Sequence, residues 1–360
     1  MNDKIGPRNI IKTYHPGFDV WGFLVIDNTM LGPGKGGIRM TPTVSEEEVA
    51  KLARAMTLKN ALAGIAFGGA KAGLALDPRA RPATEVKKII EWFARELKPL
   101  IPNRYIAGPD INTTEREMAW FVGAIKDRRG ATGKPKRLGG LPHELGSTGY
   151  GVALATLEAL RFKKIETRNA TVAVEGFGNV GQFAAKFLSE QGTKIVAVSD
   201  SKGAIYNPAG LDLKKLMASK KQSGSVINYP DGEKLPGAKI FELETDVLIP
   251  AALPDVITNA NAEHVRAKII VEGANIPIAP AVEATLHQNG ILIVPDIVAN
   301  AGGVISSYAE YRGWNEKKMF QLVKQKITVS TSLLLKKLKT SPTKSPRDLA
   351  TTLALARLKK

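Results

Sequence analysis

Residues 171–200 decide the fold. TVAVE (171–175) is followed by GFGNVG (176–181), an apolar helical segment, and then KIVAVSD (194–200). The first stretch is typical of a buried strand, the glycine run of a GxGxxG turn, and the last of a second strand that ends in an acid. Because strand, turn, helix, strand and terminal acid occur in this order, they predict a Rossmann-type unit that binds a dinucleotide.

Each part of this motif has a physical role at a dinucleotide site. Gly176 permits the tight turn, Gly178 lets a pyrophosphate pass close to the backbone, and Gly181 lets the helix pack on the strand. The amino terminus of the helix stabilises the phosphate charge. The cofactor-binding residues predicted at this turn are Gly176, Gly178, Asn179, Val180 and Gly181.

The acid that ends the second strand bears on the choice of cofactor. Asp200 could accept hydrogen bonds from both ribose hydroxyls and would repel a 2′-phosphate, which favours NAD. Ser201 and Lys202 follow directly and could solvate and neutralise that phosphate, which favours NADP. Both NAD and NADP therefore stay open as cofactors.

Three further apolar stretches downstream read as strands of the same sheet, at 247–250, 268–273 and 291–295. In a doubly wound sheet the carboxyl ends of the strands line the ligand crevice. Asn275 and Asn300 each follow one of these strands, so we expect them to face the cofactor. The alternative is that both are ordinary turn residues.

The amino-terminal half contains a helix, predicted over 45–63, whose apolar face leads to a lysine. Ser45 and Glu48 have the spacing of a capping box. Continued along the helix, the apolar face reaches Lys59, and a lysine on a buried stripe is typical of a functional site. The alternative is that Lys59 extends to solvent at the helix end. The apolar face is formed by Val49, Leu52, Ala53 and Met56.

Two glycine-rich stretches, 32–37 and 68–73, each hold a single lysine, Lys35 and Lys71. We interpret both as short connections in which the backbone approaches its neighbours closely, although a solvated turn is the alternative for either one. With Lys59 and Asp110 they could serve a reaction at a substrate carbon. Protonated lysines bind carboxylates, and a lysine that is buried among like charges loses its proton near neutral pH and becomes a base.

Length and composition limit the organisation of the chain. The 360 residues contain no cysteine, which excludes disulfides, a cysteine nucleophile and a Cys-ligated metal centre, and we predict no metal site. No apolar run approaches the ~20 residues that a membrane helix needs, so we expect a soluble, cytoplasmic protein. We predict a two-domain α/β fold, with a substrate domain at 1–146, a Rossmann domain at 147–300, and 301–360 returning to the substrate domain.

The positive charge is concentrated near the carboxyl terminus. The formal net charge is +17, and residues 317–360 carry 12 of the 51 Lys and Arg but one of the 34 acids, Asp348. The rest of the chain has an ordinary charge balance and few aromatic residues. This argues against nucleic-acid binding as the main function. We interpret the basic stretch as a solvated helix face or a subunit contact. The alternative is a site for an anionic partner.

Seven segments together resemble the glutamate dehydrogenase family, part of the wider glutamate/leucine/phenylalanine/valine dehydrogenase superfamily. The resemblance runs in order from about residue 5 to 315. The segments are GPGKGGIRM (32–40), MTLKNALAG (56–64), FGGAKAG (67–73), AGPDINT (107–113), VEGFGNVG (174–181), EGANIP (272–277) and NAGGVISSYAEY (300–311).

The resemblance implies reversible oxidative deamination of an L-amino acid to a 2-oxo acid and ammonia with NAD or NADP. By the same resemblance, Lys71 is the catalytic lysine that activates water, and Asp110 exchanges protons with the amino group. Lys59 would bind the α-carboxylate, and Lys35 and Ser307 the side-chain carboxylate of glutamate. Lys35 points to L-glutamate and 2-oxoglutarate, because a buried cation beside an apolar side chain would stay unpaired.

The resemblance further places Val304 at the substrate and Thr148 at the cofactor, and it implies a homohexamer. Two alternatives stay open. The enzyme could prefer another amino acid, of the leucine, valine or phenylalanine type. The chain could also be a binding or regulatory protein without catalysis, although Lys35, Lys59, Lys71 and Asp110 together argue against that.

Overall fold

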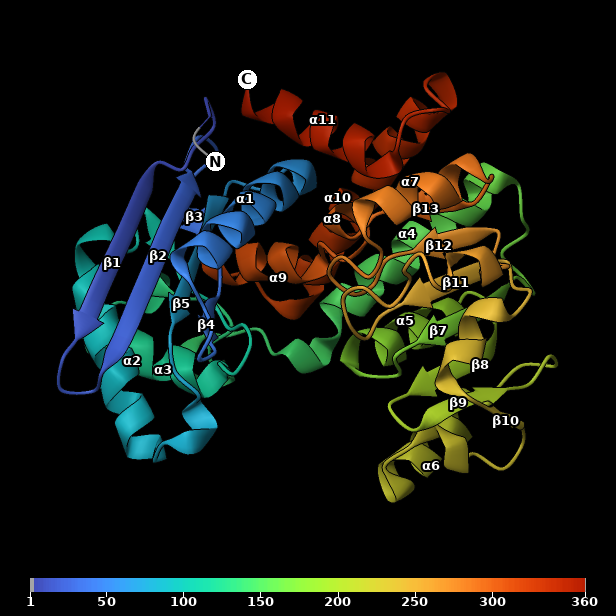
Figure 1. The fold of residues 1–360 in the computed structure, drawn as a ribbon, viewed down its shortest axis with the longest axis horizontal. Helices are drawn as coiled ribbons and strands as arrows, with labels where there is room; N and C mark the ends of the chain where they lie inside the picture. The colour runs from blue at the N-terminus through green and yellow to red at the C-terminus, as the bar shows by residue number, and fades with distance from the viewer. Residues whose placement is uncertain (1–2, 360) are drawn as a thin grey trace. The chain divides into compact units, whose positions relative to one another are not determined.

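The computed structural model describes residues 3–359, which form two compact units (Figure 1). Unit 1 consists of the residues up to Leu145, Val304–Leu322 and the residues from Ala354 onward, and unit 2 of Gly146–Gly303 and Val323–Leu353. The expectation that all of 301–360 returns to the first domain differs from this division. Residues 323–353 belong to unit 2, where Ser332 Oγ, for example, donates to Glu158 Oε2 at 3.1 Å.

A mixed sheet forms the centre of unit 1. Strands β1, β2 and β5 are antiparallel neighbours, β3 and β4 lie parallel to β5, and β6 lies parallel to β3. The strands are β1 (Asn9–His15), β2 (Val20–Asn28), β3 (Gly34–Lys35), β4 (Ile38–Met40), β5 (Gly68–Leu74) and β6 (Tyr105–Ile106).

Helices cover both faces of this sheet because β2 alternates its apolar side chains between them. Leu24 and Ile26 belong to a buried cluster with residues of α2 and α3, whereas Phe23 and Val25 pack with residues of α1. The three helices are α1 (Glu46–Ala63), α2 (Ala83–Leu97) and α3 (Glu115–Ile125).

Helix α1 begins where the sequence predicts, but its details differ. Ser45 Oγ accepts from the Glu48 backbone N–H at 3.2 Å, while the Glu48 carboxylate binds Arg39 instead of closing a capping box. The predicted apolar face is also shifted, because Leu52, Met56 and Lys59 are only half-buried. The buried face consists of Val49, Ala53, Thr57, Asn60, Ala61, Leu62 and Ala63.

The segment 68–73, which we interpreted as a connection, is instead part of the central strand β5. Its glycines allow α1 and the neighbouring backbone to lie directly against the strand. A Cβ on Gly69 would be 2.1 Å from Thr57 Oγ1, and a Cβ on Gly68 would be 1.9 Å from the Asn28 carbonyl oxygen. The glycine content therefore serves close packing inside a sheet rather than a turn.

Unit 2 is built on a seven-stranded sheet in the order β10-β9-β8-β7-β11-β12-β13. Strands β7, β8, β11, β12 and β13 are parallel, and β9 and β10 form an antiparallel edge. The chain order reverses on either side of β7, which confirms the predicted Rossmann-type architecture. The strands are β7 (Thr171–Glu175), β8 (Lys194–Asp200), β9 (Gly203–Tyr206), β10 (Glu233–Leu235), β11 (Val247–Pro250), β12 (Ile269–Val271) and β13 (Leu292–Val294).

Eight α-helices follow residue 145 among the residues that the structure describes. They are α4 (Ser147–Lys163), α5 (Asn179–Ser189), α6 (Leu213–Ser223), α7 (Pro280–Gln288), α8 (Asp296–Ala299), α9 (Gly302–Tyr311), α10 (Glu316–Thr340) and α11 (Pro346–Leu358). None of the helices within residues 3–359 combines the length and apolarity that crossing a bilayer requires.

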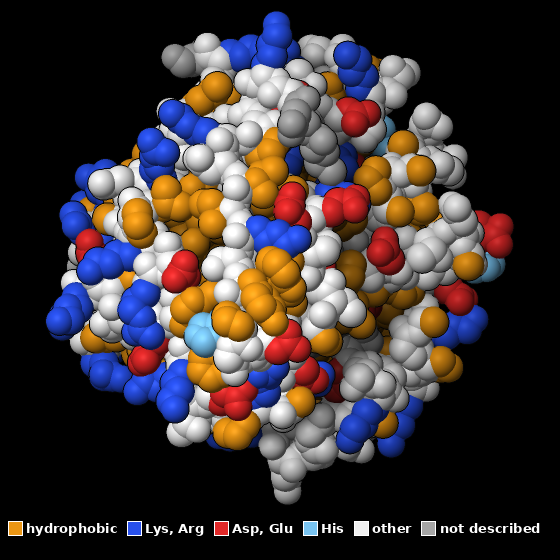
Figure 2. Space-filling model, turned by 60° about the vertical axis from the view of Figure 1, so that its left-hand side comes forward, with side chains coloured by type: hydrophobic (Ala, Val, Ile, Leu, Met, Phe, Trp, Pro, Cys, Tyr) orange, Lys and Arg blue, Asp and Glu red, His pale blue; other side chains and the backbone are white. Residues whose placement is uncertain are grey.

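The basic carboxyl-terminal stretch is only in part a solvated face. Most of its lysines are exposed, but Arg347 forms ion pairs within unit 2 and Arg357 donates to the carbonyls of Ala61 and Leu62 within unit 1. On the face that Figure 2 shows, Lys and Arg side chains are interspersed with Asp and Glu.

Candidate functional site

Lys71 and Asp110 form an ion pair at the centre of unit 1. Lys71 lies on β5 with 6% of its surface exposed, and its Nζ is 2.8 Å from Asp110 Oδ2. Asp110 follows β6 in a turn held by Thr113, whose Oγ1 accepts from the Asp110 N–H at 2.8 Å and donates to the Ile38 carbonyl at 2.7 Å. A central strand and a fixed turn therefore hold the amine against the carboxylate.

Burial and charge shift both pKa values. Burial lowers the pKa of Lys71 below its ordinary value, although Asp110 opposes the shift. Burial raises the pKa of Asp110, but the neighbouring Lys71 and Arg39 outweigh it, so that this pKa lies below its ordinary value. A lysine with a lowered pKa can give up its proton and act as a base at a pH where an exposed lysine cannot.

Arg39 is a site residue that the sequence analysis missed. Its Nε lies 3.0 Å from Asp110 Oδ2, the same oxygen that pairs with Lys71, and its Nη1 lies 2.5 Å from Glu48 Oε1. Arg39 thus joins helix α1 to the Lys71–Asp110 pair. A signal was present, because Arg39 lies in the GPGKGGIRM segment four residues after Lys35.

Lys35 is a second buried amine in the same unit. Its surface is 4% exposed, and its Nζ donates to the Ala107 carbonyl at 3.0 Å. Gly108 leaves room for the ammonium group, because a Cβ there would be 2.3 Å from Nζ. Burial lowers the pKa of Lys35 to about 7, with Lys71 and Lys134 adding to the shift and Glu310 and Asp110 opposing it.

A buried ion pair that the sequence analysis missed lies near Lys35. Lys134 Nζ is 2.5 Å from Glu310 Oε1, and Glu310 also accepts from the N–H groups of Gly133 at 3.0 Å and Leu141 at 2.9 Å. Glu310 lies on α9 one turn after Ser307, so the pair fixes the helix that carries Ser307. The pairing has no local signal, because the two residues are 176 positions apart.

The remaining predicted substrate residues lie on helices of unit 1. Lys59 is half-buried near the end of α1, next to Asn60, whose Nδ2 donates to the Gly68 carbonyl at 2.6 Å. Val304 and Ser307 are half-buried on α9. The residue before β5, Phe67, places α9 beside this strand, because its ring centroid is 5.3 Å from those of Tyr308 and Tyr311.

A cavity of about 420 Å³ opens onto Asp110 in unit 1. This volume falls within the range of small-molecule sites. Three acids and two threonines contribute to its lining, and Asp110 joins it to Lys71. The lining residues are Pro109, Asp110, Thr113, Thr114, Glu115 and Glu144.

The predicted dinucleotide turn in unit 2 has the geometry that a pyrophosphate requires. Gly176 has φ +86°, and a Cβ on it would be 2.6 Å from the Ala252 nitrogen. A Cβ on Gly181 would be 2.2 Å from the Gly176 carbonyl oxygen, whereas Gly178 is exposed and faces open space. Helix α5 begins at Asn179 without a side-chain cap, so its first N–H groups are available for phosphate oxygens.

Asp200, at the end of β8, is already engaged by its own chain. Its carboxylate accepts from the backbone N–H of Val226 at 2.8 Å and of Lys202 at 3.0 Å, and from Ser225 Oγ at 2.9 Å. Burial raises its pKa, but these donors and Lys220 outweigh burial and lower it. Ser201 and Lys202 are exposed beside it.

Lys220 is a further residue that the sequence analysis missed. Its Nζ lies 3.5 Å from Asp200 Oδ2 and donates to the Phe177 carbonyl at 2.7 Å. A cation of α6 therefore lies between the GxGxxG turn and the acid expected at the ribose. It offsets the charge that would repel a 2′-phosphate.

Asn275, Asn300 and Thr148 lie in unit 2. Asn300 Nδ2 donates to the carbonyls of Gly273 and Ala274 and, at 3.0 Å, to Asn275 Oδ1. Asn300 thus orders the turn after β12, on which Asn275 is exposed. Thr148 is in the first turn of α4, where a Cβ on Gly303 would be 2.9 Å from its Oγ1.

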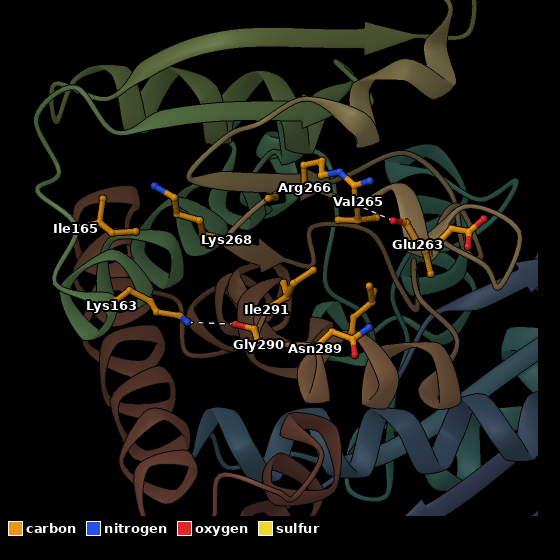
Figure 3. Close-up of a pocket in the computed structure, with 12 residues that line it drawn as sticks. Lys163, Ile165, Glu263, Val265, Arg266, Lys268, Asn289, Gly290 and Ile291 are labelled. Atoms are coloured by element: carbon orange, nitrogen blue, oxygen red, sulfur yellow. Dashed lines mark hydrogen bonds between the residues drawn. The ribbon is translucent and has the colours of Figure 1, made fainter.

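Figure 3 shows a separate cavity of unit 2, with a volume of about 560 Å³. Lys268 and Ile291, which line it, directly precede β12 and β13. The cavity is therefore at the amino ends of these strands, opposite the carboxyl ends where a doubly wound sheet binds its ligand. Within residues 3–359, no group of three or more His, Cys, Asp or Glu side chains is arranged to hold a metal ion.

Comparison with family models decides the relationship. Residues 139–360 match the model of the glutamate/leucine/phenylalanine/valine dehydrogenases, and residues 18–127 match that of the Glu/Leu/Phe/Val dehydrogenase dimerisation domain. The chain belongs to the Glu/Leu/Phe/Val dehydrogenase family. The resemblance found in the sequence is thereby confirmed.

Relatives within this dehydrogenase family are similar over most of their length. Glutamate dehydrogenase of Thermotoga maritima is 44% identical over 81% of this chain and 72% of its own. NADP-specific glutamate dehydrogenase of Saccharolobus shibatae is 42% identical over 79% of this chain and 69% of its own. NAD-specific glutamate dehydrogenase of Staphylococcus aureus is 38% identical over 85% of this chain and 77% of its own.

A solved structure of the dehydrogenase family has the same fold. The hetero-hexameric glutamate dehydrogenase of Thermus thermophilus, in a leucine-bound form, superimposes with a TM-score of 0.85 at 30% identity. The match covers 98% of this chain and 88% of that one. The two-unit α/β architecture is therefore that of a dehydrogenase.

Proposed function

We propose that the protein is a glutamate dehydrogenase, which deaminates L-glutamate to 2-oxoglutarate and ammonia, reversibly, with NAD or NADP. The observation that carries this proposal is Lys35, a buried amine in the same unit as the Lys71–Asp110 pair. A carboxylate on the substrate side chain would give Lys35 the anionic partner that an apolar side chain cannot supply.

Lys71 and Asp110 divide the proton transfers between them. When bound, an oxidised nicotinamide would supply the acceptor for the hydride that leaves the substrate α-carbon. Neutral Lys71 accepts a proton from the water that attacks the resulting imino carbon. Asp110, 2.8 Å from Lys71, exchanges protons with the substrate nitrogen, so that ammonia departs and the 2-oxo acid remains.

Other side chains bind and orient the substrate. Lys59 binds the α-carboxylate, Lys35 and Ser307 bind the side-chain carboxylate, and Val304 supports the carbon chain. Helix α9 holds Ser307 and Val304 in place through the buried Glu310–Lys134 pair. Fixed orientation of this kind lowers the entropic part of the barrier.

The coenzyme is held by unit 2 in this proposal. Gly176, Gly178 and Gly181 form a cradle that a Cβ would fill or strain, and the uncapped start of α5, with Asn179 and Val180, binds the pyrophosphate. Asp200, Ser201 and Lys202 lie at the ribose, and Thr148, Asn275 and Asn300 lie toward the nicotinamide half.

Lys220 gives a prediction about the coenzyme. Because its ammonium offsets Asp200, we expect Lys220→Gln to raise the KM for NADP by about tenfold or more, the effect of losing one charged hydrogen bond. The KM for NAD is expected to change less than about threefold, a shift that corresponds to under 1 kcal/mol. The measurement is initial rates with each nucleotide. An equal loss for both nucleotides would contradict the role of Lys220 at the phosphate.

The assembly and the setting are also proposals. We propose a homo-oligomer, specifically a hexamer, supported by the hexameric relative from Thermus thermophilus, and size-exclusion chromatography with light scattering tests it. We also propose a cytoplasmic setting.

The experiment that tests the function is a panel of L-amino acids assayed for reduction of NAD and of NADP. We expect L-glutamate to be the preferred substrate. Preference for leucine, valine or phenylalanine would show another amino-acid dehydrogenase. The absence of turnover with every amino acid, despite coenzyme binding, would show a binding protein.

A further inference from the structure

Arg347, near the carboxyl terminus, is inserted among three carboxylates of unit 2. Its Nη2 lies 2.6 Å from Glu272 Oε2, its Nε 2.6 Å from Glu283 Oε2, and its Nη1 2.7 Å from Asp296 Oδ1. The Arg347 side chain is 14% exposed, those of Glu272 and Glu283 are fully buried, and that of Asp296 is 4% exposed. A single guanidinium at the start of α11 therefore binds β12, α7 and α8 together.

Two of these carboxylates hold the turn that follows β12. Glu272 directly precedes Gly273, and its Oε2 accepts from the Asp296 backbone N–H at 2.8 Å. Asp296 Oδ2 accepts in turn from the N–H of Ile276 at 3.2 Å. Ile276 has φ +48°, a conformation that a β-branched residue adopts only where its surroundings impose it. Arg347 thus holds the turn 273–276 in place through these two carboxylates, while Asn300 donates hydrogen bonds to carbonyls of the same turn.

The cluster has more acids than its cation can neutralise. Burial raises the pKa of Glu272 well above its ordinary value, Arg347 opposes this, and Asp296 and Glu283 add to it. Burial likewise raises the pKa of Glu283. Glu272 Oε1 is buried without a hydrogen-bond partner, so a proton on this carboxyl displaces no existing contact. The cluster of Arg347 and its three carboxyl groups therefore keeps a proton at a pH at which exposed carboxyls are already ionised.

The charged groups around this cluster come from each element packed there: Glu272 after β12, Glu283 on α7, Asp296 on α8 and Arg347 on α11. The nearby His287 on α7 bonds elsewhere, to the carbonyls of Ile291 and Pro342. As the pH rises, the cluster loses its proton, and the carboxylates that hold the turn repel one another. We expect the turn to loosen as a result.

We propose that Arg347 is a positioning residue for the coenzyme: through Glu272 and Asp296, helix α11 fixes the turn 273–276 that carries Asn275. This inference rests on the proposed function, in which that turn faces the nicotinamide half of the coenzyme. Arg347 itself touches neither substrate nor coenzyme in this proposal. The basic carboxyl-terminal stretch thereby contributes to coenzyme binding through one arginine.

The test uses the full-length protein, with NADH and NADPH as fluorescent probes. Arg347→Lys keeps the positive charge but cannot bind three carboxylates at once as the guanidinium does. We therefore expect the Kd of the reduced coenzyme to rise about tenfold or more. The glutamate KM at saturating coenzyme is expected to stay within about threefold. The matched control is Lys344→Met, which removes an exposed cation three residues away and should leave the Kd unchanged.

A second variant, Glu272→Gln, tests the role of the proton that the cluster holds. This test remains valid even if Arg347→Lys does not fold. In Glu272→Gln the amide oxygen can replace Oε2 and the NH₂ the unpartnered Oε1, which mimics the protonated acid. We expect wild-type coenzyme affinity to fall as the pH rises and Glu272→Gln to flatten this dependence.

Wild-type coenzyme affinity in a folded Arg347→Lys variant, or an unchanged pH dependence in Glu272→Gln, would overturn the inference. Failure of the wild-type protein to bind either coenzyme would instead overturn the proposed function on which the inference rests.

Discussion

Lys71→Ala is expected to lower kcat for glutamate by about a thousandfold or more, within the contribution of a general base, while the Kd for reduced coenzyme stays near that of the wild type. Lys71 is buried, and its Nζ lies 2.8 Å from Asp110. Removal of this amine removes the base that accepts the proton of the attacking water. The measurements are turnover by reduced-nicotinamide absorbance and coenzyme binding by fluorescence.

Lys71→Arg is the matched control that separates charge from proton transfer. Arginine keeps a cation beside Asp110 but does not release its proton in the working pH range. We therefore expect this variant to be inactive as well. In the wild type, kcat should rise with pH, because burial lowers the pKa of Lys71 and only its neutral form acts as a base. Normal turnover in Lys71→Arg would contradict the assigned role.

Lys35→Leu is expected to lower kcat/KM for glutamate by about a hundredfold or more, the effect of removing one partner of a buried charge pair. Apolar amino acids such as L-norvaline should gain, because the side-chain site is then apolar. The pKa of Lys35 is lowered to about 7, so its charged form declines as the pH rises through this value. Glutamate affinity should therefore fall above pH ~7, and norvaline should lack this dependence.

Stability measurements separate this effect from unfolding. A lysine whose folded pKa is below its unfolded pKa destabilises the fold while it is charged, and this penalty is fully present below the folded pKa. Lys35→Leu removes the penalty, so we expect the variant to melt no lower than the wild type at pH ~6. If glutamate specificity were unchanged in a folded Lys35→Leu variant, Lys35 would not recognise the side-chain carboxylate.

The Rossmann half of the fold was readable from sequence because its signals are local. Strands β7 and β8 have the predicted bounds, 171–175 and 194–200, and the GxGxxG turn joins β7 to α5. Apolar runs bounded by glycine and acids fix such elements without reference to the rest of the chain. Thr114, which caps α3 in a full capping box, is likewise fixed by residues close to it in the chain.

Strand β5 was not readable, because glycines that serve close packing look like glycines that serve a turn. Gly69 accommodates Thr57 of α1, and that contact exists only once the helix and the strand have met. The apolar face of α1 was displaced for the same reason, since β5 selects which side of the helix is buried.

The partners of the site residues were missed because they are distant in sequence. Arg39 reaches Asp110 across 71 positions, and Arg347 reaches Glu272 across 75. The role of each arginine follows from the fold that brings the carboxylates to it. Lys35, Lys71 and Asp110 were singled out from the residues themselves and given their roles by resemblance, and the structure places the three in one unit.

The most direct measurement is the ratio of kcat/KM for L-glutamate to that for L-norvaline in the wild-type protein, with each nucleotide. These substrates differ in the side-chain carboxylate that Lys35 is proposed to bind. The account predicts a preference for glutamate of about a hundredfold or more, the effect of pairing a buried charge. Equal rates, or a preference for norvaline, would contradict it.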